Sequence, residues 1–422
     1  MLTIRICVAV LILLWLGAIT GASDASELKI KAGAGYDFIS QEYYLDSLIV
    51  DTLEAQLATS KTFLDDFKTK LNIYYAPGKL RNWELRTGLE QTSEFFRFKL
   101  SSDNILRWGN NTFEWNNDID WRSRYRGDDD PGDSYIYGQT RARLKRKLSE
   151  SLTIRGQADF DAVRFDSISD YNYNYYRVGG KVGISKTFPD FSFLDINLFL
   201  LNRQVVDSTD LNYLSTGFDG SYFNFMELNE LDFYLRLEHK DYKKTDNSDD
   251  YYRLELDGRH KYRFSESCYL REELDFELAI FNEDDLINEN YTRTGVTFQG
   301  GIQKGDIDLR FGPDFEYLAQ QNTYDYDNSE SYFEFGVKAD FDYIKIGRFF
   351  GSLESIFGYR NLKYESELQS NFSFERLSVI ADWNLVGGLS FNIMFSAEWE
   401  WHDNRDENSQ IFLLNSGLYY NF

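Results

Sequence analysis

The feature that most limits how this chain can fold is an alternation of bulky apolar and polar residues along almost its whole length. From Leu389 to Trp401, large apolar residues take nearly every odd position, and the same period recurs from Phe113 to Trp121 and from Leu231 to Glu238. Successive side chains of a β-strand point to opposite faces of the sheet. The alternation therefore predicts strands that each have one apolar and one polar face.

The length of the alternating segments separates a membrane barrel from a soluble β-sandwich. Many of them run for roughly twelve to fifteen residues, whereas strands of globular proteins usually have about five or six. A tilted strand that spans a bilayer needs about nine to eleven residues. No linker divides the chain, which has only 4 prolines. We therefore predict one all-β domain, a transmembrane antiparallel up-and-down β-barrel.

Two kinds of connection alternate between these segments. Short turns are expected at residues 148–151, 188–191, 264–267, 304–306, 346–348 and 386–388. Longer acidic connections are expected at residues 126–133, 166–170, 245–250, 282–289, 321–329 and 403–408. Outer-membrane barrels have short periplasmic turns and longer outer loops, so the two sets should lie on opposite sides of a membrane.

The number of strands follows from the same segments. We count about sixteen strands from Ile105 to the C-terminus, and the segments before it bring the total to about twenty, an even number as in single-chain bacterial barrels. Those earlier strands are expected at Leu28–Ile39, Leu48–Thr59, Phe67–Tyr75 and Leu80–Leu100. The last of them changes parity midway, so we expect a β-bulge in it. A barrel of about eighteen strands is the nearest alternative.

The first 25 residues have the pattern of a secretory signal peptide. A basic start precedes an uncharged apolar run from Ile6 to Ile19, and small residues follow it. The run is too short to span a bilayer as a helix. We therefore expect residues 1–25 to be removed and residues 26–422 to form the barrel. So little chain precedes the first strand that we expect no N-terminal plug domain, and Cys268 alone would remain in the mature chain, without a disulfide partner.

Charged residues on the polar face of the strands are expected to line the barrel interior. A Lys or Arg facing lipid at mid-membrane costs about 2–4 kcal/mol, so the bulky face should lie outside. Acidic and basic side chains on neighbouring strands are expected to form cross-strand pairs. The predicted pore-lining residues are Arg141, Arg143, Lys145, Lys147, Arg253, Glu255, Asp257, Arg259, Arg263, Arg271, Glu273, Asp275 and Glu277.

These residues favour a passive channel for small polar or charged solutes. The basic series on alternate positions from Arg141 to Lys147 could favour anions. The alternative is a non-conducting structural barrel braced by ion pairs, or an adhesive one that acts through its acidic outer loops, where Arg126 to Asp128 forms an Arg-Gly-Asp tripeptide. The net charge of −24 argues against a nucleic-acid partner, which needs a basic surface.

Nothing in the sequence points to catalysis, a cofactor or a metal site. The 3 histidines include His402, which lies beside Asp403, but no nucleophile accompanies this pair. His239 and His260 fall on the lipid-facing register. The acidic loop at Asp128, Asp129, Asp130 and Asp133 could hold Ca²⁺, but it lacks the spacing of an EF-hand, and we expect a solvated loop. We therefore predict a protein that is not an enzyme.

The C-terminal segment carries a resemblance to bacterial outer-membrane proteins, which typically end in an aromatic residue preceded by alternating apolar residues. The corresponding residues here are Phe412, Leu414, Leu418, Tyr420 and Phe422, with Ser416 the one departure. The chain resembles the porin-like β-barrel superfamily of Gram-negative outer membranes, without matching a particular family. The resemblance implies that this strand is read by the barrel-assembly machinery and that outer-membrane lipid surrounds the folded chain.

Overall fold

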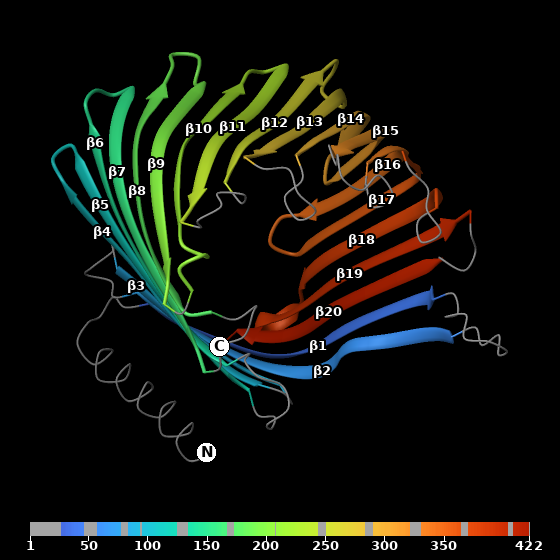
Figure 1. Ribbon diagram of the computed structural model, residues 1–422, viewed down its shortest axis with the longest axis horizontal. Coiled ribbons are helices and arrows are strands. Elements are labelled where there is room, and N and C mark those ends of the chain that lie inside the picture. Colours follow the sequence, from blue (N-terminus) through green and yellow to red (C-terminus); the bar gives the residue numbers. More distant parts are fainter. Residues whose placement is uncertain are drawn as a thin grey trace.

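In the computed structural model the chain forms one sheet of 20 strands, and the ring closes between the first and last strands (Figure 1). The structure describes residues 27–45, 57–76, 83–92, 95–124, 134–166, 173–206, 208–243, 250–282, 290–320, 331–363, 370–403 and 408–421. The strands are β1 (Glu27–Leu45), β2 (Leu57–Ala76), β3 (Trp83–Gln91), β4 (Phe95–Trp108), β5 (Asn111–Arg124), β6 (Tyr135–Lys147), β7 (Leu152–Phe165), β8 (Tyr175–Thr187), β9 (Phe193–Val205), β10 (Tyr213–Phe225), β11 (Asn229–Tyr242), β12 (Tyr251–Arg263), β13 (Cys268–Phe281), β14 (Tyr291–Lys304), β15 (Ile307–Gln320), β16 (Tyr332–Lys345), β17 (Phe349–Leu362), β18 (Phe372–Asn384), β19 (Leu389–His402) and β20 (Ser409–Asn421).

Each strand pairs antiparallel with its neighbours in sequence, and β1 completes the ring by pairing with β20. In that last pair, Lys31 faces Asn421 and Tyr43 faces Ser409. Closure satisfies the backbone groups that an edge strand would leave unpaired, as a hydrocarbon environment requires. Among the described residues, no helix is long and apolar enough to cross a membrane. The predicted up-and-down barrel of about twenty strands is confirmed.

The strands expected before Ile105 agree only in part with the structure: Leu28–Ile39 lies within β1 and Phe67–Tyr75 lies within β2. The expected strand Leu48–Thr59 overlaps only the first three residues of β2, and its residues 48–56 lie outside the described part of the chain. Leu80–Leu100 was expected to form one bulged strand, but its residues belong to β3 and β4, which pair with each other. The described strands total 20, as predicted.

Between Leu80 and Leu100 the apolar residues change from odd to even positions because the chain reverses direction between β3 and β4, not because of a bulge. The Thr92 amide donates a hydrogen bond to the Phe95 carbonyl at 3.0 Å, and the Phe95 amide donates to Thr92 Oγ1 at 3.1 Å. The beginning of the sixteen-strand region also shifts. Ile105 to Trp108 end β4, and Gly109, with φ of 52°, turns the chain into β5.

From β4 onward the predicted short turns lie together at one end of the barrel, whereas the tight reversal between β3 and β4 lies at the opposite end. In the turn between β8 and β9, the Ser192 amide and hydroxyl donate to Asp190 at 3.1 Å and 2.7 Å. These bonds lower the pKa of the Asp190 carboxyl, because they stabilise its charged form. The structure adds a short turn at Met226–Leu228 that the sequence did not reveal. Most residues of the longer connections lie outside the described ranges.

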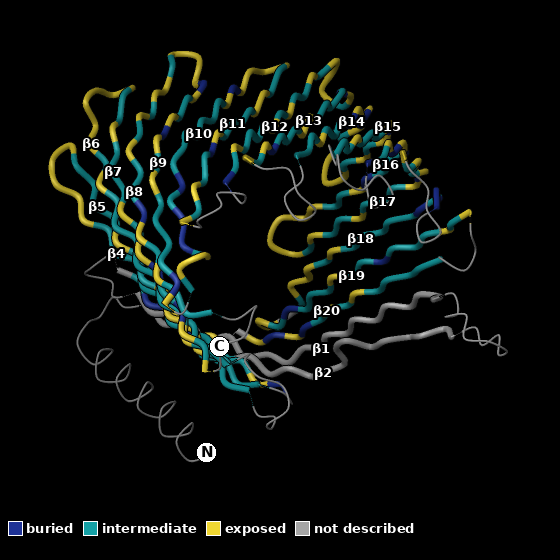
Figure 2. The backbone as a smooth tube through the Cα atoms, in the orientation of Figure 1, coloured by how far each residue is buried: buried dark blue, intermediate teal, exposed yellow. Residues whose placement is uncertain are grey.

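The two faces of the sheet differ in the side chains that they present. Large apolar residues on the outward face are strongly exposed, among them Leu106, Val182, Leu198, Phe311 and Phe357, each about 60% accessible. Exposed and intermediate residues dominate the wall, and buried ones are scattered (Figure 2). A soluble protein rarely exposes so much contiguous apolar surface, whereas lipid contact requires it.

Candidate functional site: the charged inner face

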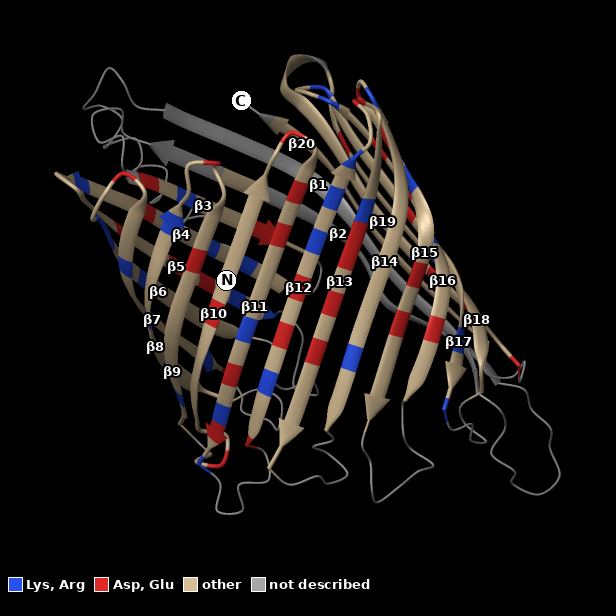
Figure 3. Ribbon diagram, turned by 90° about the horizontal axis from the view of Figure 1, so that it is seen from above, with Lys and Arg blue, Asp and Glu red and all other residues tan. Residues whose placement is uncertain are grey.

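The inner face is identified by side chains that touch across an intervening strand. Arg155 of β7 forms an ion pair with Asp195 of β9, and Lys181 of β8 lies 2.6 Å from Asp219 of β10. Side chains on a concave surface converge, so contacts of this kind belong to the inside of a barrel. Alternation then assigns every second residue of each strand to the inner face. All of the predicted pore-lining residues lie on this face, where bands of both charges cross the strands (Figure 3).

On β6, ion pairs engage most of the basic series. Arg141 lies 2.7 Å from Asp159 of β7. Glu114 of β5 lies 3.4 Å from Arg143 and 2.6 Å from Lys145. Lys147 is exposed and has no ion pair within the described part of the chain. Neighbouring carboxylates therefore offset most of the charge that the sequence places here.

On the β12–β13 hairpin, cross-strand ion pairs of the predicted kind form, but some directly opposed residues carry like charges. Glu255 lies directly opposite Glu277, and Asp257 lies opposite Asp275. Like charges in this position destabilise a sheet unless a counter-ion bridges them. Arg253 supplies that bridge for the first pair, because its guanidinium lies 2.8 Å from Glu255 and 2.6 Å from Glu277.

The same hairpin is basic nearer its short turn. Lys261 lies opposite Arg271, which is a second pair of like charges. Arg259 lies opposite Glu273, but its Nε is 3.8 Å away, because Arg271 binds the same carboxylate at 2.5 Å. The hairpin thus has an acidic zone followed by a basic zone.

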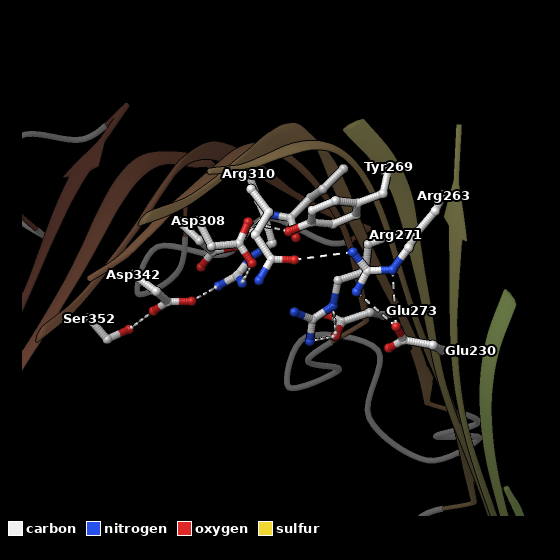
Figure 4. A network of polar contacts seen from close by, with 12 residues as sticks. Glu230, Arg263, Tyr269, Arg271, Glu273, Asp308, Arg310, Asp342 and Ser352 are labelled. Atoms are coloured by element: carbon white, nitrogen blue, oxygen red, sulfur yellow. Dashed lines mark hydrogen bonds and ion pairs between the residues drawn. The ribbon is translucent and has the colours of Figure 1, made fainter. Parts of the chain in front are cut away.

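A polar network on β11 to β17, which the sequence analysis did not single out, lies beside this basic zone (Figure 4). At its centre, Arg310 is only 12% exposed and binds Asp342 at 2.7 Å, Asp308 at 3.3 Å and Asp340 at 3.4 Å. The Tyr269 hydroxyl donates to Asp308, so the network continues across β14. Alternating charges at Asp308 and Arg310 were the signal that could have revealed it.

The network also connects strands on either side of Arg310. The Ser352 hydroxyl donates to Asp342 at 2.6 Å, and the Gln299 amide donates to Asp340 at 2.5 Å. Gln299 is 1% exposed, and its contact crosses from β14 to β16. On the β11 side, Arg263 lies 3.0 Å from Glu230 and 3.2 Å from the amide oxygen of Gln303.

His402 is held in place by several contacts. Its ring lies 4.5 Å from that of Phe372, and its Nε2 lies 3.5 Å from Glu400. Ser370 Oγ lies 3.5 Å from Nδ1, which is the limit of a hydrogen bond, and Ser370 is 8% exposed. A nucleophile needs a close base and access to its substrate, so this trio lacks the geometry of a catalytic Ser-His-acid group. His239 and His260 lie on the outward face, where they contact Tyr252 and Glu272.

The residues with the C-terminal resemblance lie together on β20. Phe412, Leu414, Leu418 and Tyr420 share the outward face, and the last two are 46% and 43% exposed. Phe422 lies outside the described residues. The expected signal peptide at 1–25, the acidic loop from Asp128 to Asp133 and the Arg-Gly-Asp tripeptide lie outside them as well.

Comparison with solved structures places the architecture in a known class. The FrpB iron transporter from Neisseria meningitidis is similar with a TM-score of 0.56 and 10% identity, over 96% of this chain and 82% of that chain. OpdQ from Pseudomonas aeruginosa has a TM-score of 0.51 and 10% identity, over 94% and 97%. A BenF-like porin from Pseudomonas fluorescens Pf-5 has a TM-score of 0.50 and 10% identity, over 94% and 99%.

At these identities the likeness establishes the fold alone, a closed antiparallel β-barrel like those of FrpB, OpdQ and the BenF-like porin. The barrel fold that the C-terminal resemblance implied is confirmed. No protein-family model and no curated protein sequence matches the chain.

Proposed function

We propose that this protein is a passive channel of the outer membrane through which small polar or charged solutes diffuse, and that it is not an enzyme. The observation that carries the proposal is the contrast between the two faces of one closed sheet. Charged groups such as Arg141, Arg259 and Glu255 lie on the inner face, while the outward face presents exposed apolar side chains. Charged lumen walls are typical of water-filled barrels, and barrels of about sixteen to eighteen strands already leave an aqueous channel.

The competing proposal is a non-conducting barrel in which the same ion pairs brace the wall. Pairs that cross a strand, such as Arg376 with Glu334 at 2.9 Å, would stiffen it. Their exposure favours the channel: the side chains of Arg253, Arg141 and Arg259 are 36%, 43% and 68% exposed. Side chains that only filled a closed lumen would be shielded from water.

Single-channel recording in a planar lipid bilayer decides between the two proposals. The refolded barrel, verified by heat-modifiable migration on a gel, should give discrete current steps, and the same sample heated to unfolding should give none. A sample that is fully folded by the gel criterion and yet gives no current above the baseline would refute the channel.

We also propose that the channel selects only weakly between anions and cations. Carboxylates within 4 Å of Arg141, Arg143 and Lys145 offset the basic series that would otherwise favour anions. The reversal potential in a salt gradient should therefore be small. A strongly anion-selective potential would show that the unpaired cations control permeation.

We propose that the barrel-assembly machinery inserts this chain into the membrane and that it recognises the outward-facing apolar residues of β20. These residues are continuous with the lipid-facing surface, as an insertion signal of this kind requires. Replacing Leu418 and Tyr420 by Asn should reduce the amount of barrel inserted in vivo. The same protein should still refold in detergent, which separates recognition from stability.

A further inference from the structure

A hollow of about 290 Å³ lies on the wall from β10 to β13, close to the short turns of these strands, and residues of β15 also line it. Its lining includes Phe223, Asp232, Arg259 and Lys261. The volume is at the lower end of those that hold small molecules. Asp308 and Arg310 of the network described above form the far side of the hollow, and no binding role has been assigned above to the hollow itself.

Strand pairing places an aromatic ring, an acid and a base in one row across the hollow. Phe223 lies opposite Asp232, and Asp232 lies opposite Arg259. Directly opposed residues of antiparallel strands are about 5 Å apart, so the three side chains form adjacent steps on one face. The Phe223 side chain is 41% exposed and leaves apolar surface open to the hollow.

The charged residues of this row, Asp232 and Arg259, have no close ion pair with the described residues around them. Arg259 is 68% exposed, and its one carboxylate contact is at 3.8 Å. Within the described parts of the chain, Asp232 forms no ion pair, and neither does Lys261. The Lys261 ammonium lies instead 3.8 Å from the centre of the Tyr269 ring, and Lys261 faces the like charge of Arg271.

The other charges around the hollow are already engaged. Glu230 binds Arg263 at 3.0 Å, and Asp308 binds Arg310 at 3.3 Å. Two bases and one acid therefore remain available at the hollow, next to an aromatic ring. A simple anion would meet Asp232, and a simple cation would meet Arg259 and Lys261. A solute that carries both charges on neighbouring atoms would satisfy all three groups.

We propose that this hollow is a binding subsite for small zwitterions with an apolar side chain, the chemistry of neutral α-amino acids. Arg259 and Lys261 bind the carboxylate, Asp232 binds the ammonium group, and the apolar side chain packs against Phe223. Charge-assisted hydrogen bonds of this kind are stronger than neutral ones. The subsite rests on the proposed channel function, because a solute reaches it from the lumen.

The test is block of the single-channel current by leucine, compared with N-acetyl-leucine, which has only the carboxylate, and leucinamide, which has only the ammonium group. Block is expressed relative to the open-channel current of the same protein. Leucine should block at concentrations at least about tenfold below either analogue, about 1.4 kcal/mol in binding. Asp232→Asn and the double variant Arg259→Gln/Lys261→Gln should each weaken leucine block about tenfold. Lys304→Gln, on the outward face, is the matched control.

The outcomes separate the subsite from the channel. Equal block by leucine and its analogues, or unchanged leucine block in both variants, would overturn the subsite and leave the channel proposal intact. If neither the parent chain nor its variants conduct, equilibrium dialysis of labelled leucine against the detergent-solubilised barrel tests binding at the hollow directly. Binding that Asp232→Asn abolishes would then support the subsite alone, and no saturable binding would overturn it.

Discussion

Glu255 and Glu277 face each other across β12 and β13, and the guanidinium of Arg253 lies within 3 Å of both carboxylates. The Tyr291 hydroxyl donates to Glu277 at 2.5 Å and adds a second polar contact. One cation thus makes an otherwise repulsive cross-strand pair compatible with the sheet.

Replacing Arg253 should show how much this bridge stabilises the barrel. The Arg253→Gln variant leaves two opposed carboxylates without a counter-ion. Because the Arg253 side chain is 36% exposed, we expect a loss of only about 1 kcal/mol in the free energy of unfolding. Urea unfolding in detergent, followed by heat-modifiable migration, measures it. Adding Glu255→Gln to this variant should restore most of the loss, and a double variant as unstable as the single one would contradict the repulsion argument.

The turn between β8 and β9 contains a non-glycine residue with positive φ. Phe191 has φ of 64°, and its side chain is 80% exposed, so packing does not explain its conformation. The left-handed region costs an L-residue roughly 1–2 kcal/mol, and a β-branched side chain more. Phe191→Gly should therefore keep or slightly raise stability, while Phe191→Val should lower it by about 1 kcal/mol. Equal unfolding midpoints for the two variants would show that strain at this position is unimportant.

Two glycines give a matched pair for testing how tightly the strands approach. A Cβ at Gly312 would lie 1.8 Å from the Phe298 carbonyl oxygen, whereas at Gly138 it would meet nothing within 4 Å. We expect Gly312→Ala to destabilise the barrel by about 1–3 kcal/mol, because the β14–β15 pair must move apart. Gly138→Ala should unfold like the parent chain. Similar midpoints for the two variants would mean that the sheet yields locally at Gly312.

The sequence predicted the barrel well because its strongest signal, the two-residue period, acts through hydrophobic burial on one face of each strand. The two-residue period alone places the odd-numbered charged residues from Arg253 to Arg263 and from Arg271 to Glu277 on the inner face. The odd or even position of a residue, however, does not determine which residue of the neighbouring strand lies opposite it. The turn at Phe264, whose amide donates to the Cys268 carbonyl at 2.9 Å, determines that Glu255 meets Glu277. Neither this register nor contacts across an intervening strand could be predicted, since both depend on turn geometry and curvature.

The N-terminal errors have a similar cause. Between Leu80 and Leu100, the apolar residues change from odd to even positions, which fits either a bulge or a tight reversal. The reversal depends on two hydrogen bonds between Thr92 and Phe95, and these cannot be predicted from the local composition. The network around Arg310 was missed for a different reason: its members lie on seven strands, β11 to β17, and no short segment contains them all.

Replacing Arg310 should affect both stability and selectivity. Arg310 is 12% exposed and lies within 4 Å of Asp308, Asp340 and Asp342. Removing one partner of a buried ion pair costs about 3–5 kcal/mol, because the remaining charge has no compensation. Arg310→Met should therefore lower the unfolding midpoint more than Arg253→Gln does.

The same variant should change permeation, since three carboxylates on the inner wall lose their shared cation. We expect Arg310→Met to shift the reversal potential in a salt gradient toward cation selectivity, and the shift should shrink as salt screens the exposed charge. Adding Asp342→Asn should reverse part of it, because Asp342 has the shortest contact with Arg310, at 2.7 Å. A destabilised variant with an unchanged reversal potential would mean that this network stiffens the wall without facing the permeation path.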